Sequence, residues 1–449
     1  MEYLRSNRVD QTQVFRGSRT LQRVIFHIGA HKTGTSAFQR WLTHNYPLLD
    51  RSGIAIPTGL IGQTGNASSL AKALSKQNRL RTPSDAAEVE ALSLFSNANA
   101  HRPLFFSAEY FETANSVGQL GFVSDLMDEW RRGEKTAVLI VRNQIDLKNS
   151  NYGQSCKSLT RNHPFRLGRR KGAPVNVRDW DECRTVIQDS GFVPRIGVYR
   201  GKEPGYSIAR QVMDLSGLLD YLPADTDFST TSVNDSIGEL GCIVGRHLHG
   251  VLEKKPHAEA EKIRGTLSQM LITACKAYPD QPFNGFTAGE RADVRAFCQD
   301  SNLALGLHLD GGIDEARLLL GSSSDDRKKS PVDWSDLTQD QVEIVLSILE
   351  DVTDMVMDNP QARRLLNHHD ILPTAAQTGS PQFAVTRSPG PVPVPKERPK
   401  RQNLPNAMPK KHVLKPPATW INDPWRMRLT LPRIRASLSR RIRGILGIT

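Results

Sequence analysis

The first half of the chain alternates short apolar runs with longer stretches of helical periodicity. Apolar runs at residues 24–28, 104–106 and 137–141, and a weaker run at 195–198, are typical of buried strands. Helical patterns lie between these runs, and they cover residues 36–49, 86–95 and 117–131. Strands that alternate with helices predict a central parallel sheet covered on both faces, which is a three-layer α/β/α fold.

The second half of the chain has a different pattern. Residues 236–315 are mainly helical in periodicity, and residues 334–357 add a helical stretch with an acidic face. The composition then changes, because residues 371–449 hold 13 of the 27 prolines. A segment of this composition buries too little apolar surface to fold, so we expect a disordered tail after the helical part.

The end of the tail carries its own periodicity. Apolar side chains recur every four residues at Ile434, Leu438, Ile442 and Leu446, with five arginines among them. This spacing predicts a basic amphipathic helix over residues 431–449. Such a helix binds an anionic membrane surface or an acidic partner, and a solvated tail that binds neither is the alternative.

The positive charge of the chain is concentrated in this tail. The whole chain has a net charge of +12, and residues 371–449 hold 15 Lys or Arg against 2 Asp or Glu. The remainder is therefore close to neutral, and we expect no nucleic-acid binding by the body of the protein. The basic tail is the part from which charge-driven partners are expected.

Cysteine usage and hydropathy indicate the compartment. The five cysteines are odd in number and widely spread, which favours a reducing environment over a disulfide framework or a zinc site. Residues 1–20 are polar and lack the apolar stretch of a secretory signal, and no run of about 18 apolar residues appears anywhere. We expect a cytoplasmic protein, peripheral to the inner face of the membrane where the tail helix binds lipid.

The segment from residue 24 to residue 42 is the most informative part of the sequence. A strand pattern leads into a loop that runs from Gly29 to Ser36, and a helix pattern follows. Backbone amides of such a loop and the N-terminus of its helix converge on a phosphate, and Lys32 adds a positive charge. A triphosphate-binding loop places its lysine directly after the second glycine. Here Lys32 precedes Gly34, so we expect the loop to bind a phosphate but not in the way that ATP- or GTP-binding loops do.

A second cation follows another predicted strand. The run at residues 137–141 delivers Arg142 at its carboxyl end, and Ser150 follows eight residues later in a helical pattern. Arginine suits bidentate phosphate binding, and a serine one turn into the next helix can share the same phosphate. Carboxyl ends of parallel strands meet at one edge of a sheet, so this pair and the loop are expected to face one ligand.

Together these motifs resemble the sulfotransferase family that uses 3′-phosphoadenylyl sulfate, in its bacterial carbohydrate-sulfotransferase-like branch. Residues 26–36, Phe-His-Ile-Gly-Ala-His-Lys-Thr-Gly-Thr-Ser, are similar to the first motif, and Arg142 and Ser150 have the spacing of the second. The resemblance implies that Arg142 and Ser150 bind the 3′-phosphate. It implies that the 5′-phosphosulfate is bound by Gly29, His31, Lys32, Thr33, Gly34, Thr35 and Ser36.

Looser similarities extend the resemblance over residues 21–320. They lie at residues 45–57, 106–109 and 233–236. The chain departs from the family at residues 143–145, Asn-Gln-Ile, where an aromatic or acidic residue often follows the 3′-site arginine. The segment 156–177 is unusually basic, which suits either an acceptor-facing surface for an acidic glycan or a solvated loop.

The resemblance and the composition together divide the chain into five expected parts. They are a polar N-terminal arm (1–20), a sulfotransferase-like P-loop domain (21–325), a helical extension (326–370), a proline-rich disordered linker (371–430) and the basic amphipathic helix (431–449).

The expected chemistry is in-line transfer of a sulfuryl group to a hydroxyl or amine of an acceptor, a glycan or glycolipid. Lys32 is expected to neutralise the leaving oxygen, and no metal is expected. A base must take the acceptor proton. Glu109 is the first candidate because it follows the strand at 104–106, and His31 is the alternative. His27 also lies nearby, but its place on the strand favours a core role.

Two other functions fit parts of this pattern. A P-loop kinase or NTPase shares the phosphate loop, but it needs Gly-Lys-Ser/Thr and a strand-end aspartate for magnesium. Here the strand at 137–141 ends in Arg142. A catalytically silent scaffold that binds partners through the basic tail is the other alternative, and intact Lys32, Arg142 and Ser150 argue against it. The acceptor and the oligomeric state are not encoded in any motif.

Overall fold

The computed structural model describes most of the chain up to residue 373. The described residues are 23–29, 32–113, 117–130, 133–170, 172–201, 203–230, 236–278, 281–321 and 327–373. The N-terminal arm, His31, the linker beyond residue 373 and the helix expected at 431–449 lie outside them.

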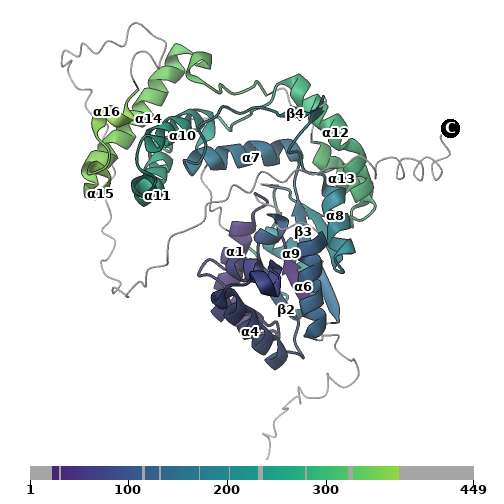
Figure 1. Cartoon of the computed structure of the whole chain (residues 1–449). Coiled ribbons are helices and arrows are strands. Elements are labelled where there is room, and N and C mark those ends of the chain that lie inside the picture. Colours follow the sequence, from purple (N-terminus) through teal and green to yellow (C-terminus); the bar gives the residue numbers. More distant parts are fainter. Residues whose placement is uncertain are drawn as a thin grey trace, which may run out of the picture. The chain divides into compact units, whose positions relative to one another are not determined.

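A four-stranded parallel sheet forms the centre of the fold, as predicted (Figure 1). The strands are β1 (Arg23–His27), β2 (Leu104–Ser107), β3 (Glu134–Val141) and β6 (Val193–Val198), in the order β2-β1-β3-β6. The register pairs Phe26 with Phe106 on one side and with Ala137 on the other. All four carboxyl ends therefore point to the same edge of the sheet.

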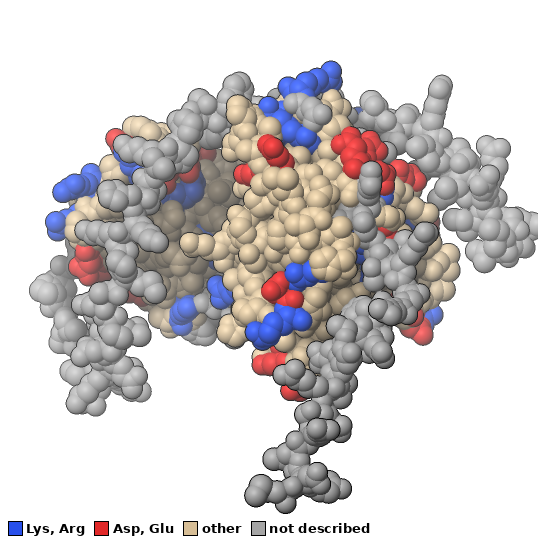
Figure 2. All heavy atoms as spheres, turned by 90° about the horizontal axis from the view of Figure 1, so that it is seen from below, with Lys and Arg blue, Asp and Glu red and all other residues tan. Residues whose placement is uncertain are grey.

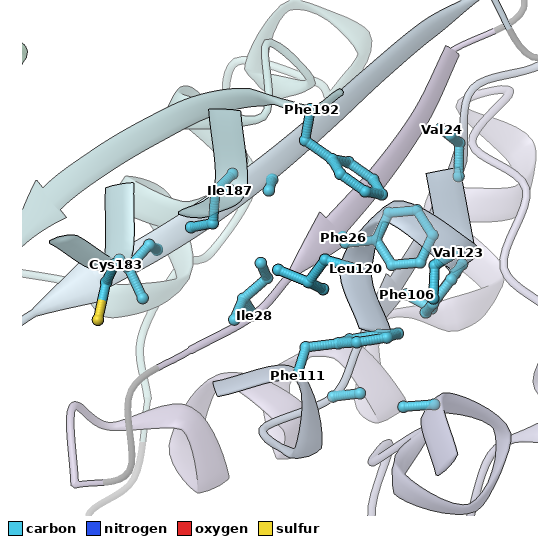
Figure 3. Packing of buried hydrophobic residues seen from close by; sticks show 14 of the residues in the cluster. Val24, Phe26, Ile28, Phe106, Phe111, Leu120, Val123, Cys183, Ile187 and Phe192 are labelled. Carbon is cyan, nitrogen blue, oxygen red and sulfur yellow. The ribbon is translucent and has the colours of Figure 1, made fainter. Parts of the chain in front are cut away.

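The sheet is buried on both faces because its strands are apolar at successive positions. Val24, Phe26 and Ile28 belong to one hydrophobic cluster, while Ile25 belongs to a second cluster on the opposite face. Figure 3 shows the first cluster, in which the rings of Phe26 and Phe106 meet edge to face with centroids 4.2 Å apart. Side chains alternate between the faces of a strand, so a continuous apolar run produces this two-sided core.

Helices cover both faces and complete an α/β/α arrangement. The helices α1 (Thr35–His44) and α9 (Ile208–Leu215) pack on one face, and α6 (Val117–Glu129) and α8 (Trp180–Asp189) pack on the other. The remaining helices and strands are α2 (Tyr46–Arg51), α3 (Ser68–Ser75), α4 (Pro83–Ala98), α5 (Tyr110–Thr113), α7 (Gln144–Lys157), β4 (Arg169–Arg170), β5 (Ala173–Pro174), α10 (Gly238–Glu253), α11 (His257–Cys275), α12 (Ala288–Gly306), α13 (Gly312–Leu320), α14 (Gln339–Asp358), α15 (Pro360–Arg363) and α16 (His368–Ile371).

The helix predicted over residues 36–49 is wrong in its extent, because the structure breaks it at Asn45. The backbone amide and the side-chain amide of Asn45 both donate to the carbonyl of Trp41, at 3.0 and 2.9 Å, and so end α1. Pro47 lies in the first turn of α2, where its missing amide is tolerated. The periodicity of the apolar residues did not predict this break.

A second hydrophobic core lies in the helical part of the chain. It gathers buried residues of α7, α10, α11 and α14, among them Tyr152, Leu248, Leu271 and Val352. Its members come from both sides of residue 325, where the helical extension was expected to begin. The stretch predicted at 334–357 starts with a short 3-10 turn, and α14 begins after Thr338, which caps it. Within the described residues, no helix is long and apolar enough to cross a membrane.

Candidate functional site

The described part of the loop between β1 and α1 contains three residues with left-handed backbone conformation. Gly29, Lys32 and Gly34 have positive φ angles of 44°, 67° and 82°. Gly34 occupies the cap position of α1 without a side chain that accepts from the first amides of the helix. Those amides are the groups that bind an anion at a helix N-terminus. The positive φ of Gly29 and Gly34 explains why the sequence places glycine at both positions.

Two residues from outside the loop hold Lys32. Arg142, which follows β3, donates from Nη1 to the backbone carbonyl of Lys32 at 2.8 Å. Gln154 of α7 accepts from the Lys32 ammonium, with Nζ and Oε1 2.6 Å apart. Lys32 is not a glycine and yet has a positive φ, a conformation that an L side chain adopts only when its surroundings impose it. The contact with Arg142 supplies that constraint on the backbone.

The electrostatics of the site act mainly on Lys32. Burial lowers the pKa of Lys32 to about 8, and the positive charges of Lys157 and Arg142 act in the same direction. The carboxylate of Glu109 opposes this shift. An ammonium with such a pKa remains largely charged at neutral pH. A bound anion would raise its pKa back toward the ordinary value.

Arg142 is held by contacts on both sides of the sheet edge. Its guanidinium lies over the ring of Tyr199, 5.5 Å from the centroid, and its carbonyl accepts from Trp180 Nε1 at 2.9 Å. Tyr199 follows β6 directly, and its amide donates to the carbonyl of Val141 at 2.8 Å. A Cβ placed on Gly34 would lie 3.2 Å from Cε2 of Tyr199, so this ring also packs against the loop.

Glu109 reaches the loop from the end of β2. Its carboxylate accepts a hydrogen bond from the hydroxyl of Thr35, the first residue of α1. Thr33 and Thr35 are buried, whereas Ser36 is half-buried. The structure therefore brings Lys32, Thr35, Glu109 and Arg142 into one network at the sheet edge.

His27 lies beneath this network. Its Nδ1 is 2.8 Å from the hydroxyl of Ser107, which also accepts from Gln39 Nε2 at 3.2 Å. Burial lowers the pKa of His27 to about 4, and Glu109 opposes the shift. The ring is therefore neutral, and Nδ1 shares a hydrogen bond with the Ser107 hydroxyl. Nε2 is buried, and no described residue forms a hydrogen bond with it. Buried, neutral and hydrogen-bonded to Ser107, His27 fits the core role expected for it better than the role of a base.

Ser150 and Gln154 occupy one face of α7. They are four residues apart on the same helix, and Gln154 contacts Lys32. Helical spacing therefore puts Ser150 one turn closer to Arg142 along that face. The side chain of Asn143 caps the start of α7 by accepting from the amides of Ile145 and Asp146, at 2.9 and 3.1 Å. This cap explains Asn143, one of the positions at which the chain departs from the family pattern.

Two residues of the site were missed by sequence reasoning. Gln154 lies inside a polar helix and had no motif to mark it, although its i+4 spacing from Ser150 is a usable signal. Tyr199 follows the weakest of the predicted strands, and its place at a strand end is the only sign of its role. Neither residue belongs to the loop that identifies the site.

The basic segment at 156–177 has several internal partners. Arg161 lies over the ring of Tyr152 at 5.4 Å, and Arg169 forms an ion pair with Asp293. Lys and Arg side chains are interspersed with Asp and Glu over the face shown in Figure 2, which agrees with the near-neutral body. Among the residues that the structure describes, no group of three His, Cys, Asp or Glu is placed to hold a metal ion.

Comparison with known proteins gave no assignment: no protein-family model, no curated protein and no solved structure matches this chain.

Proposed function

We propose that the protein is a sulfotransferase that moves a sulfuryl group from 3′-phosphoadenylyl sulfate to a hydroxyl or amine of an acceptor. The observation that carries the proposal is the placement of Lys32. It lies in the loop that precedes α1, its carbonyl is held by a strand-end arginine, and its ammonium lies beside α7. This arrangement offers cations from two strand ends to one ligand, which suits a nucleotide with phosphates at both ends of the nucleoside.

The 5′-phosphosulfate is proposed to bind at the loop. Amides of the first turn of α1, that of Thr35 among them, and the hydroxyl of Ser36 hold the phosphate, and Lys32 neutralises charge on the bridging oxygen as it leaves. The contact with Lys32 uses one of the five N–H donors of the Arg142 guanidinium. The remaining donors, with Ser150, are proposed to bind the 3′-phosphate.

Transfer is proposed to proceed in line. The acceptor oxygen forms a bond to sulfur while the bond between sulfur and the bridging phosphate oxygen breaks, and adenosine 3′,5′-bisphosphate leaves. The acceptor proton passes to the carboxylate of Glu109, which now accepts from Thr35. His31 remains the alternative base, and it lies outside the described residues.

The acceptor and the location are part of the same proposal. A glycan or glycolipid is the proposed acceptor class, and the basic segment at 156–177 is the surface proposed to face it. Cytoplasmic placement, with contact between the tail helix and the inner membrane face, is compatible with such a substrate.

A kinase or NTPase is the main competing function, and nucleotide binding separates the two. Calorimetric titration of the full chain with adenosine 3′,5′-bisphosphate, and separately with ATP and Mg²⁺, is the test. We expect the bisphosphate to bind and ATP with Mg²⁺ to bind at least tenfold more weakly, about 1.4 kcal/mol. Tight ATP binding without affinity for the bisphosphate would overturn the proposal. If neither nucleotide binds, the result favours the catalytically silent scaffold.

A further inference from the structure

The Lys32 ammonium forms a hydrogen bond with a residue of the helical part of the protein. It donates to Oε1 of Gln154 at 2.6 Å, across 122 positions of sequence. An ammonium can only donate, so the oxygen of the Gln154 amide must be the end that faces it. This contact fixes the orientation of the amide as well as the direction of Lys32.

The NH₂ group of the Gln154 amide also has a hydrogen-bond partner. Its Nε2 donates to the hydroxyl of Ser158, one turn later on the helix, at 2.8 Å. Flipping the amide would direct its NH₂ group at the ammonium, where two donors would oppose each other. The ammonium therefore selects the orientation of the amide, and the bond to Ser158 holds the Gln154 side chain in that place.

The helix that carries Gln154 is anchored in the second hydrophobic core. Tyr152 and Cys156, on either side of Gln154, are buried there. The side chain of Ser268 in α11 donates to the carbonyl of Lys157 at 2.6 Å, and Asn149 accepts from the amide of Gly285 at 3.0 Å. The position of Gln154 beside the Lys32 ammonium is thus set by the packing of the helical core.

A neutral hydrogen-bond acceptor stabilises the Lys32 ammonium against the positive charges around it. Lys157 on α7 and Arg142 after β3 repel its ammonium, and Glu109 after β2 attracts it. Half-buried groups feel such repulsion more strongly than exposed ones, because less water screens it. Gln154 contributes an oxygen that favours the charged form of Lys32 without adding a charge that would repel an anionic donor.

We infer that Gln154, held in place by Ser158, is the positioning residue that keeps the Lys32 side chain protonated and directed at the loop. Its catalytic meaning rests on the proposed function, but its effect on Lys32 does not. The helical part of the protein thereby completes a site whose backbone belongs to the sheet. The alkaline limit of activity is set by Gln154 through Lys32.

The test compares variants that move Lys32 in opposite directions. The pH dependence of Lys32 acetylation under trace labelling, read by mass spectrometry, gives its titration in the full chain without any ligand. We expect Gln154→Leu to lower the midpoint by about one pH unit. Gln154→Glu raises it, and Ser158→Ala lowers it by less than Gln154→Leu. Ser155→Ala, at a neighbouring hydroxyl that bonds only its own helix at 3.0 Å, is the matched control and leaves it unchanged.

The same variants are then assayed with 3′-phosphoadenylyl sulfate. The alkaline limb of the activity profile is expected to follow the Lys32 midpoints, downward in Gln154→Leu and upward in Gln154→Glu. An unchanged Lys32 midpoint in both Gln154 variants overturns the inference, whatever the enzyme does. If the midpoints shift but the wild-type chain neither binds adenosine 3′,5′-bisphosphate nor transfers sulfate, the inference stands and the proposed function fails.

Discussion

The sheet and the helical core contribute to the candidate site by different means. The sheet supplies positions: its strand ends deliver the glycine loop, Glu109 and Arg142, and their placement follows from parallel pairing. The helical core supplies Gln154, whose place depends on how α7 packs against α10 and α11. The loop that we propose to bind phosphate can thus be located from the sheet half alone. The protonation state of its lysine depends on the helical half.

The largest effect is expected where the two regions meet. Lys32→Ala removes the ammonium that both regions hold, and we expect transfer to fall by about 10²–10³-fold, as for loss of a group that stabilises developing charge. Thermal unfolding is expected to stay close to wild type, because the substitution leaves the backbone contact with Arg142 possible. Lys135→Ala, on the same sheet and paired with Asp128 at 2.7 Å, is the control. Full activity in Lys32→Ala would remove the lysine from the mechanism.

The next prediction concerns the sheet half alone and is the pH dependence of stability that His27 causes. Its pKa of about 4 in the folded state lies below its ordinary value of 6.5, so the unfolded chain takes up a proton first as the pH falls. This linkage lowers stability as the pH falls from 6.5 to 4, by about 3 kcal/mol in total. Denaturant unfolding between pH 7 and 4 measures it.

The comparison for this measurement is His27→Gln, which keeps a polar side chain and removes the titration. We expect a smaller loss of stability over the same pH interval in this variant, while the exposed His101→Gln retains the wild-type slope. Equal slopes in all three proteins would show that the pKa of His27 is the same in the folded and unfolded states.

A smaller effect tests the loop backbone, which is the sheet's own contribution. Gly29→Ala places a Cβ against the side chain of Thr35 at a φ of 44°, so we expect a loss of about 1–3 kcal/mol of stability and weaker bisphosphate binding. Gly121→Ala, on α6 with open space around the added carbon, is the matched control and is expected to be neutral or slightly stabilising. Unchanged binding in Gly29→Ala would move the phosphate site away from this loop.

Much of the fold was accessible to sequence reasoning because the signals are local. Each predicted strand is a continuous apolar run between turn residues, and burial on both faces requires such a run. All four lie in the sheet, although β3 starts at Glu134, earlier than its apolar part suggests. The break at Asn45 was missed because one non-helical residue between two helices barely disturbs helical periodicity.

Local sequence was enough to locate the glycine-containing loop, the strand-end cations and the alternation of strands and helices, since each depends on residues within a few positions of one another. Only the tertiary structure decided that Gln154 meets Lys32, that Tyr199 stacks under Arg142, and that His27 loses its basicity. These contacts join residues from different strands and helices. Their strength depends on burial and packing, which no local pattern in the chain records.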